Sequence, residues 1–276
     1  MALKFSIKFS GSVLGVLALL MIQMMTQISH AALPASVPCQ NGGCWKPTLN
    51  TRWNYVLSES PNLSLGAILY DIDLFDTPAS KVTQIHSLNQ RAICYMSAGS
   101  SENWRPDFGR FPASVLGANM DGWAGERWLD IRNITALAPI MRARLDLCKQ
   151  KGFDGVEFDN VDGYNNDSGF PLTANDQLQY NIFLANEAHK RGLTAALKND
   201  LDQVPILVNY FDYAVNEQCF QYGECNTLMP FINKGKPVFN VEYSGTNSVI
   251  FKKANALNFN TIKKSLNLNN KVVFSR

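Results

Sequence analysis

Short apolar runs recur along the chain, and polar residues follow almost every run at its carboxyl end. In the clearest run, Val156 and Phe158 face one side of a predicted strand. Glu157 and Asp159 face the other side, and turn-forming residues follow at 160–163. Apolar residues on one face, with carboxylates on the other and at the tip, suit a parallel strand of an α/β enzyme. In such folds the chemistry lies where the strands end.

Strand-like and helix-like segments alternate through the rest of the chain. The predicted strands are residues 53–57, 67–71, 92–97, 155–159, 194–197, 213–215, 237–241 and 259–262. The predicted helices are residues 78–90, 134–149, 174–190, 201–210, 225–234 and 246–256. This alternation predicts an α/β fold of the (β/α)8 TIM-barrel type. About ten residues separate the first two strands, too few for a full helix, so we expect a short connection there.

The predicted barrel is one domain. With 276 residues, of which 46% are hydrophobic, the chain is long enough for one large core. Residues 32–50 are rich in Pro, Gly, Asn and Cys and predict an irregular leader, so the barrel domain is expected over residues 51–276. Residues 101–132 carry Trp104, Trp123 and Trp128 and are too long for a plain connection, which predicts a functional excursion.

The N-terminus has the pattern of a secretory signal peptide. Lys4 and Lys8 precede an apolar run at 13–25, and small residues follow at 29–32. The run is short for a membrane-spanning helix, so we expect cleavage of residues 1–31 and a secreted or periplasmic protein without membrane contact. The net charge is +2, without a run of five like charges, and nothing suggests nucleic-acid binding.

Six cysteines follow the predicted signal peptide, an even number for an oxidising compartment. The pairs close enough in sequence to form small rings are Cys39 with Cys44 and Cys219 with Cys225. Cys94 and Cys148 are left to pair or stay free. Zinc is the competing interpretation, but the chain has no Cys-x-x-Cys, and its histidines lie away from the strand ends. We therefore expect neither a metal nor a cofactor.

Polar side chains collect at one end of the predicted barrel. The candidate residues at the strand tips are Asp71, Asp73, Tyr95, Ser97, Asp159, Asp162, Lys198, Asp200, Glu217, Glu242 and Tyr243. An acidic mouth with one lysine and a tryptophan-bearing loop is typical of a carbohydrate-cleaving site, where two carboxylates flank the scissile bond and aromatic faces stack on sugars. Glu157 lies inside its strand, so we prefer a buried ion pair with Lys198 to a catalytic role.

Seven motifs resemble glycoside hydrolase family 114, whose characterised members are endo-α-1,4-polygalactosaminidases. They are Tyr-Asp-Ile-Asp at 70–73, Cys-Tyr-Met-Ser-Ala-Gly-Ser at 94–100, Gly-Glu-Arg-Trp-Leu-Asp-Ile-Arg at 125–132, Gly-Phe-Asp-Gly-Val-Glu-Phe-Asp-Asn-Val-Asp-Gly-Tyr at 152–164, Leu-Lys-Asn-Asp at 197–200, Asn-Glu-Gln-Cys-Phe at 216–220 and Val-Glu-Tyr at 241–243. The likeness covers roughly residues 53–243. Phe158 replaces a proline that is frequent in the family, and the tail after about Asn258 matches none of these motifs.

The resemblance implies a secreted barrel that cleaves α-1,4 bonds in a galactosamine-containing polysaccharide with retention of configuration. It places the catalytic pair on Asp159, as nucleophile, and Glu217, as general acid/base. An acidic mouth would also suit a polymer whose deacetylated amines are cationic. The expected substrate-binding residues are Asp71, Asp73, Tyr95, Trp104, Asp162, Lys198, Asp200, Glu242 and Tyr243. The expected partner is this polysaccharide, and the expected state is a monomer.

Two other functions fit the pattern less well. A non-catalytic glycan-binding barrel would keep the aromatic loop but lose one of the two carboxylates, whereas Asp159 and Glu217 are both present. A deacetylase on a similar barrel would need a metal site of Asp and His, and no histidine lies at a predicted strand end.

Overall fold

The computed structural model describes residues 33–40 and 43–276, and residues 35–276 form one compact unit. The predicted signal peptide, residues 1–31, lies outside the described residues. Within them, no helix combines the length and the apolar character that a membrane crossing requires.

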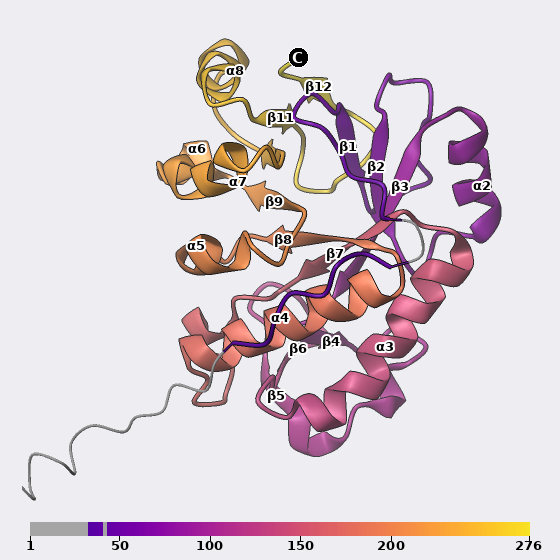
Figure 1. The fold of residues 1–276 in the computed structure, drawn as a ribbon, viewed down its shortest axis with the longest axis vertical. Coiled ribbons are helices and arrows are strands. Elements are labelled where there is room, and N and C mark those ends of the chain that lie inside the picture. The colour runs from indigo at the N-terminus through magenta and orange to yellow at the C-terminus, as the bar shows by residue number, and fades with distance from the viewer. Residues whose placement is uncertain (1–32, 41–42) are drawn as a thin grey trace, which may run out of the picture. The chain divides into compact units, whose positions relative to one another are not determined.

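A curled, nine-stranded sheet forms the centre of this unit (Figure 1). Its strands, in spatial order, are β1 (Trp53–Val56), β2 (Leu69–Asp73), β3 (Arg91–Ser97), β7 (Gly155–Asp159), β8 (Thr194–Lys198), β9 (Tyr213–Glu217), β10 (Val238–Glu242), β11 (Asn260–Lys263) and β12 (Val273–Phe274). Neighbours from β1 to β11 are parallel, and β12 is antiparallel to β11. All eight predicted strands are therefore confirmed, and the fold is of the α/β-barrel type.

Helices cover the outer side of the sheet (Figure 1). They are α2 (Ala79–Ser87), α3 (Ile134–Lys151), α4 (Ala174–Lys190), α5 (Val204–Leu207), α6 (Cys219–Tyr222), α7 (Met229–Asn233) and α8 (Asn247–Ala256). Short 3-10 turns occur at Phe108–Arg110, Ala113–Val115, Gly163–Asn165, Leu201–Gln203 and Cys225–Leu228. Residues 57–68 contain no helix, as the short connection predicted. The predicted helices at 201–210 and 225–234 are each divided into a 3-10 turn and a short α-helix.

The longest helices begin and end where local chemistry requires. Thr173 and Asp176 form a reciprocal capping box at the start of α4, which satisfies backbone N–H groups that have no partner inside the helix. Gly152 ends α3 with φ at 92°, a left-handed conformation that glycine adopts without steric cost. The chain then enters β7 directly, so the end of α3 sets the position of the strand that carries Asp159.

The C-terminal segment closes the barrel between β1 and β11. Within the described chain no strand ladder joins these two strands. Side chains link them instead: the indole of Trp53 donates to the carbonyl of Asn260 at 2.8 Å, and the ammonium of Lys264 donates to Asn54 Oδ1 at 2.7 Å. The backbone N–H of Leu57 also donates to the carbonyl of Leu268 at 3.0 Å. The tail after Asn258 is thus an integral part of the barrel.

Residues 101–132 are folded rather than irregular. They form most of a small antiparallel sheet of β4 (Ser100–Glu102), β5 (Leu116–Asn119) and β6 (Glu126–Leu129), in the spatial order β4-β6-β5. Arg144 of α3 braces this excursion: its guanidinium donates to both carboxylate oxygens of Asp107, at 2.7 and 2.9 Å, and to the carbonyl of Ser97 at 2.7 Å. The side chain of Arg144 is 1% exposed, so this bidentate pair is buried.

All six cysteines are paired in the structure. The disulfides are Cys39–Cys44, Cys94–Cys148 and Cys219–Cys225. The two short rings are those proposed from the sequence. Cys94 and Cys148, whose pairing the sequence left open, also form a disulfide. The Cys94–Cys148 bridge ties β3 to α3 across 54 residues of chain, which restricts the unfolded state more than the short rings do.

Candidate active site

A cavity of about 360 Å³ opens at the carboxyl ends of the strands. Strand tips form its floor, the small sheet with its loop at 120–128 forms one wall, and the C-terminal segment adds Leu266 and Leu268. The lining residues that carry polar groups at the floor are Tyr55, Tyr95, Asp159, Asn160, Asp162, Lys198, Asn199, Glu217 and Tyr243. The cavity therefore combines side chains from segments that are far apart in the sequence.

Each of the three central side chains ends a strand that is followed by a left-handed residue. Asp159, Lys198 and Glu217 close β7, β8 and β9, and Asn160, Asn199 and Gln218 follow with φ at 61°, 47° and 64°. The backbone carbonyl of Asp159 accepts N–H groups from residues 98 and 99. At Gly99 an added Cβ would lie 1.6 Å from the carbonyl oxygen of Asn160, so only glycine allows this close approach.

Lys198 holds the two central carboxylates together. Its ammonium Nζ lies 3.1 Å from Asp159 Oδ1 and 3.3 Å from Glu217 Oε2. The side chain of Lys198 is 2% exposed, whereas those of Asp159 and Glu217 are 20% and 28% exposed. A buried cation thus bridges two carboxylates that face the cavity.

A tyrosine hydroxyl binds the other oxygen of each carboxylate. Tyr95 donates to Asp159 Oδ2 at 2.8 Å, and Tyr243 donates to Glu217 Oε1. Burial, and then the charge of the neighbouring carboxylate, raises the pKa of each tyrosine, so both hydroxyls keep their protons and act as donors. The two carboxylates are therefore fixed in orientation from both sides.

Asp159 is held as a carboxylate. Burial alone would raise the pKa of Asp159, but the charge of Lys198, the hydroxyl of Tyr95 and the backbone N–H of Asn160 outweigh it and lower that pKa below its ordinary value. The Asn160 N–H donates to Asp159 Oδ1 at 2.9 Å. An ionised carboxylate facing a cavity can act as a nucleophile or as a base.

Glu157 and Asp71 form a buried carboxyl pair beneath Lys198. Glu157 Oε1 lies 3.1 Å from the Lys198 ammonium, which confirms the ion pair expected from the sequence. Burial, and then the charge of Glu157, raises the pKa of Asp71 well above its ordinary value. Asp71 therefore keeps its proton, because the Lys198 ammonium pairs with Glu157 rather than with Asp71. Protonated Asp71 can donate to Glu157, and each has a buried oxygen without another partner in the described chain.

Two further carboxyl groups line the cavity. Burial, and then the charge of Asp159, raises the pKa of Asp162 to about 6. Burial likewise raises the pKa of Glu126 to about 7, although the hydroxyl of Ser100 opposes this. Glu126 Oε1 also accepts from the side-chain amide of Asn160 at 3.1 Å. Both groups therefore change charge between mildly acidic and neutral pH.

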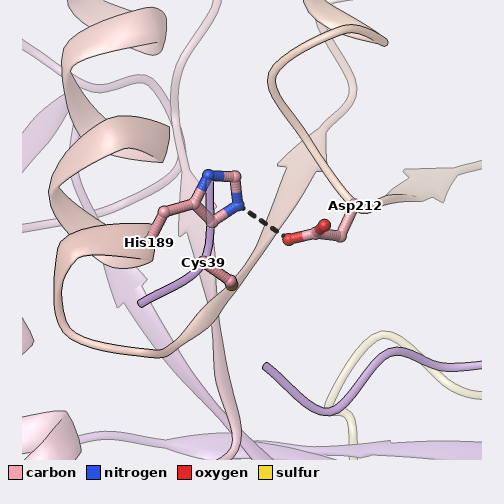
Figure 2. A group of neighbouring side chains, drawn as sticks. All are labelled: Cys39, His189 and Asp212. Carbon is pink, nitrogen blue, oxygen red and sulfur yellow. Dashed lines mark hydrogen bonds and ion pairs between the residues drawn. The ribbon is translucent and has the colours of Figure 1, made fainter. Parts of the chain in front are cut away.

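Among the described residues, one group combines several metal-ligand types: Cys39, His189 and Asp212 (Figure 2). The Cys39 sulfur belongs to a disulfide. Both imidazole nitrogens of His189 are already bonded, Nε2 to Asp212 Oδ2 at 2.8 Å and Nδ1 to the carbonyl of Val37 at 2.8 Å. Lys46 pairs with the other Asp212 oxygen at 3.0 Å. These contacts fasten the leader to the barrel and leave no ligand atom free for a metal.

Comparison with known proteins agrees with this geometry. The model of glycoside-hydrolase family GH114 matches residues 35–276. The chain belongs to family GH114. It is thus a glycoside hydrolase, and the family match includes the tail after Asn258, which the sequence motifs had left out. This GH114 chain is also similar to Ega3 of Aspergillus fumigatus, solved in complex with galactosamine, with 41% identity and a TM-score of 0.81 over 87% of this chain and 100% of that chain.

More distant structures share only the fold with the GH114 chain. The glycoside hydrolase domain of PelA from Pseudomonas aeruginosa has 12% identity and a TM-score of 0.64, over 81% of this chain and 98% of that one. Amy13B of Eubacterium rectale has 13% identity and a TM-score of 0.53, over 81% of this chain and 65% of that one. Among curated proteins, no sequence matches the chain.

The structure places part of the predicted site of this GH114 hydrolase around the cavity. The predicted residues that line it are Tyr95, Asp159, Asp162, Lys198, Glu217 and Tyr243. The predicted residues that do not line it are Asp71, Asp73, Ser97, Trp104, Asp200 and Glu242. Of the candidate residues at the strand tips, Asp71 and Glu242 therefore do not share the cavity of Asp159 and Glu217.

The direction of one side chain and the depth of another explain two of these corrections. Phe239 and Val241 of β10 belong to the core inside the barrel, so Tyr243 continues inward and Glu242 points outward. Glu242 accepts instead from the backbone N–H of Phe220 at 2.9 Å. Asp71 faces inward, but it lies one layer below the mouth and is fully buried.

The other corrections follow from local partners. Asp73 is bound by the guanidinium of Arg105, at 2.5 and 3.1 Å, and also caps the backbone after β2. Asp200 is buried and accepts from the amide of Asn181 at 2.8 Å. Trp104 is 52% exposed and lies outside the cavity lining. These side chains serve the fold or the surface rather than the cavity wall.

Several cavity residues escaped the sequence reasoning. They are Tyr55, Met120, Asp121, Glu126, Asn160, Asn166, Asn199, Leu266 and Leu268, whereas Trp123 and Trp128 belong to the predicted tryptophan-bearing excursion. A signal existed for three of them: Glu126, Asn160 and Asn199 belong to the family motifs at 125–132, 152–164 and 197–200. Leu266 and Leu268 had no such signal, because only the closure of the barrel by the tail brings them to the mouth.

Proposed function

We propose that this protein is a secreted or periplasmic endo-glycosidase that hydrolyses α-1,4-linked galactosamine polymer with retention of configuration. The observation that carries the proposal is the pair of carboxylates, Asp159 and Glu217, held across the cavity floor by one buried ammonium. Paired carboxyl groups flanking a glycosidic bond supply the nucleophile and the general acid/base of a retaining glycosidase.

The donors around each carboxylate support an assignment of the two roles. Asp159 receives hydrogen bonds from Lys198, Tyr95 and the backbone of Asn160, which favour its charged form. It is therefore the nucleophile that attacks the anomeric carbon. Glu217 is more exposed and receives only Lys198 and Tyr243 among the described residues, so it is the group that delivers a proton to the leaving oxygen.

The spacing of the two carboxylates favours retention. Because Asp159 Oδ1 and Glu217 Oε2 both lie within 3.3 Å of the same Nζ, these oxygens are separated by at most twice that distance. Retaining enzymes hold their carboxyl groups about 5–5.5 Å apart, whereas inverting enzymes need about 6.5–9.5 Å to fit a water molecule between them. The shared lysine keeps the pair near the shorter range.

The charge of the cavity supports a cationic substrate. Asp121, Glu126 and Asp162 line the cavity in addition to the catalytic pair. Lys198 is the one basic residue among the described residues of the lining, and three carboxylates already contact it. Deacetylated galactosamine carries an ammonium group that such a surface attracts. The similar structure of Ega3, solved with galactosamine, supports the same choice of sugar.

The shape of the site supports cleavage inside a chain. A second cavity of about 300 Å³, formed largely by the β1–β2 connection, shares Leu57 with the first. A polymer that runs past Leu57 would occupy both cavities and place an internal bond at the catalytic pair. Export is supported by the three disulfides, which persist in oxidising compartments, together with the predicted signal peptide.

Digestion of partly deacetylated α-1,4-galactosaminan by the mature protein tests this function. We expect medium-length oligomers early in the reaction and, by NMR, an α-anomer as the first-formed reducing end. Binding without cleavage would instead support the non-catalytic glycan-binding barrel. A β-anomer first would contradict retention, and release of monomers from the start would contradict internal cleavage.

Two exposed tryptophans allow a matched test of substrate binding. Trp123 is 61% exposed and lines the cavity, whereas Trp104 is 52% exposed and does not. We expect Trp123→Ala to raise KM about tenfold with little change in kcat, because a stacked ring contributes about 0.5–1.5 kcal/mol. Trp104→Ala should leave KM unchanged. Equal effects of the two substitutions on KM would refute this assignment.

A further inference from the structure

The ammonium of Lys198 lies within ion-pair distance of three carboxyl groups. An ammonium has three donors, and Nζ lies 3.1 Å from Glu157, 3.1 Å from Asp159 and 3.3 Å from Glu217. The Tyr55 hydroxyl, 3.2 Å from Nζ, also lies 3.3 Å from Glu157 Oε1, to which it can donate. The lysine comes from β8, the strand between the two that carry the catalytic pair.

Accepting the proposed function, we propose that Lys198 is a positioning residue that serves each catalytic carboxylate in turn as counter-ion, while Glu157 anchors it from below. Glu157 is fully buried and does not face the cavity, so its charge stays constant through the reaction. Asp159 and Glu217 face the substrate, and their charges change. Because the Lys198 ammonium lies close to both carboxyl groups, it can balance the negative charge of either one without moving.

In the first step the negative charge passes from one carboxyl group to the other. Asp159 Oδ forms a bond to the anomeric carbon as the glycosidic C–O bond breaks, and the proton of Glu217 goes to the leaving oxygen. Asp159 becomes a neutral ester and Glu217 becomes a carboxylate. The Lys198 ammonium, already 3.3 Å from Glu217 Oε2, then balances the new charge.

The second step returns the negative charge from Glu217 to Asp159. Water attacks the anomeric carbon, Glu217 takes one proton of that water, and the bond to Asp159 breaks. Asp159 is again a carboxylate 3.1 Å from the ammonium, and Glu217 is again neutral. The net charge of Glu157, Lys198 and the catalytic pair is the same in every state. A buried site gains from this, because an unbalanced charge in a poorly solvated environment is costly.

The pH profile is sensitive to this arrangement. The titratable groups that interact with Lys198 are Tyr55, Asp71, Tyr95, Glu157, Asp159, Asp162, Glu217 and Tyr243. The three tyrosines and Asp71 keep their protons across the working range, because burial raises the pKa of each. Asp162, whose pKa is raised to about 6, also titrates in this range, but only Asp159 and Glu217 exchange a bond or a proton with the substrate during turnover.

Two substitutions should move the bell-shaped profile of kcat/KM in opposite directions. Lys198→Met removes the cation, so both limbs should move to higher pH by about one unit or more, and kcat should fall about 10²-fold or more. Glu157→Gln removes a neighbouring negative charge and leaves the cation, so both limbs should move to lower pH. A purely structural role for either residue would change the amount of folded protein without moving the limbs.

Lys236→Met is the matched control, because it also removes a largely enclosed lysine. Its ammonium donates to the carbonyls of Val208 and Phe211, at 2.6 Å each, far from the strand tips. Its stability should fall while both limbs stay in place. If Lys198→Met shifted the acid limb alone, the proposal that Lys198 balances both catalytic carboxylates in turn would be wrong. If Glu157→Gln moved the limbs to higher pH or left them in place, the anchoring role of Glu157 would be wrong.

A readout without turnover separates this inference from the proposed function. Carbon-13 NMR of aspartate-labelled protein follows the ionisation of Asp159 directly, and that ionisation should move to higher pH in Lys198→Met and to lower pH in Glu157→Gln. If the wild-type protein cleaves no galactosamine polymer while these shifts occur, the proposed function fails and the role of Lys198 as counter-ion stands. If Lys198→Met does not fold, Glu157→Gln decides the question alone.

Discussion

Replacing Asp159 by asparagine should abolish turnover, by about 10⁴-fold or more, without unfolding the protein. Asparagine has nearly the same shape, and its carbonyl oxygen can still accept from Tyr95 or from the backbone of Asn160. It cannot form the glycosyl ester, because it lacks the nucleophilic carboxylate oxygen. Measuring kcat on the galactosamine polymer, together with thermal unfolding and substrate binding, checks this result.

The control is Asp146→Asn on the outer face of α3. Asp146 is 66% exposed and pairs only with Arg191 in the described chain, so activity and stability should both stay near the wild-type values. Near-normal rates for Asp159→Asn would show that another group is the nucleophile. Loss of binding as well as turnover would point to a distorted cavity rather than to lost chemistry.

Replacing Glu217 by glutamine should produce a different pattern of loss. Glutamine cannot deliver a proton to the leaving oxygen, so hydrolysis of the polymer should fall about 10²–10⁴-fold. An aryl glycoside with a good leaving group needs no such proton, and its first step should be much less affected. The glycosyl ester on Asp159 should then accumulate, because Glu217 is also absent as the base that activates water.

Azide separates the two roles. It needs no general base, so it should restore turnover of the aryl glycoside by Glu217→Gln and give a glycosyl azide with the configuration of the substrate. With Asp159→Asn, azide would have to attack the substrate itself and would give the opposite anomer. If Glu217→Gln gave the opposite anomer and Asp159→Asn the retained one, the roles assigned to the two carboxyl groups would be reversed.

The order of strands and helices was predictable because it depends on local periodicity. Each barrel strand alternates over only four to seven residues, yet its apolar face must be buried, and this requirement shows directly in the sequence. The small sheet of β4, β5 and β6 was not predicted. Its strands are three or four residues long and lie among glycines and turns, so too few alternations exist to reveal them.

The polar residues at the strand tips show a limit of the same reasoning. A tip residue points into or out of the barrel according to its parity, and one position separates the buried Glu242, which faces away, from Tyr243, which binds Glu217. The sequence shows that polar residues gather at one end. The sequence does not show which of these side chains contact one another, because the strands end at different positions relative to their inward-facing residues.

The sequence by itself predicted the barrel order and the cysteines of the two short rings, because both depend on spacing along the chain, whereas the catalytic pair followed from the family resemblance. Only the tertiary structure decided that Lys198 contacts Glu157, Asp159 and Glu217 at once, and that the tail brings Leu266 and Leu268 to the mouth. The physical reason is that these contacts arise from the curvature and closure of the sheet. They join residues that are far apart in sequence and leave no periodic trace in it.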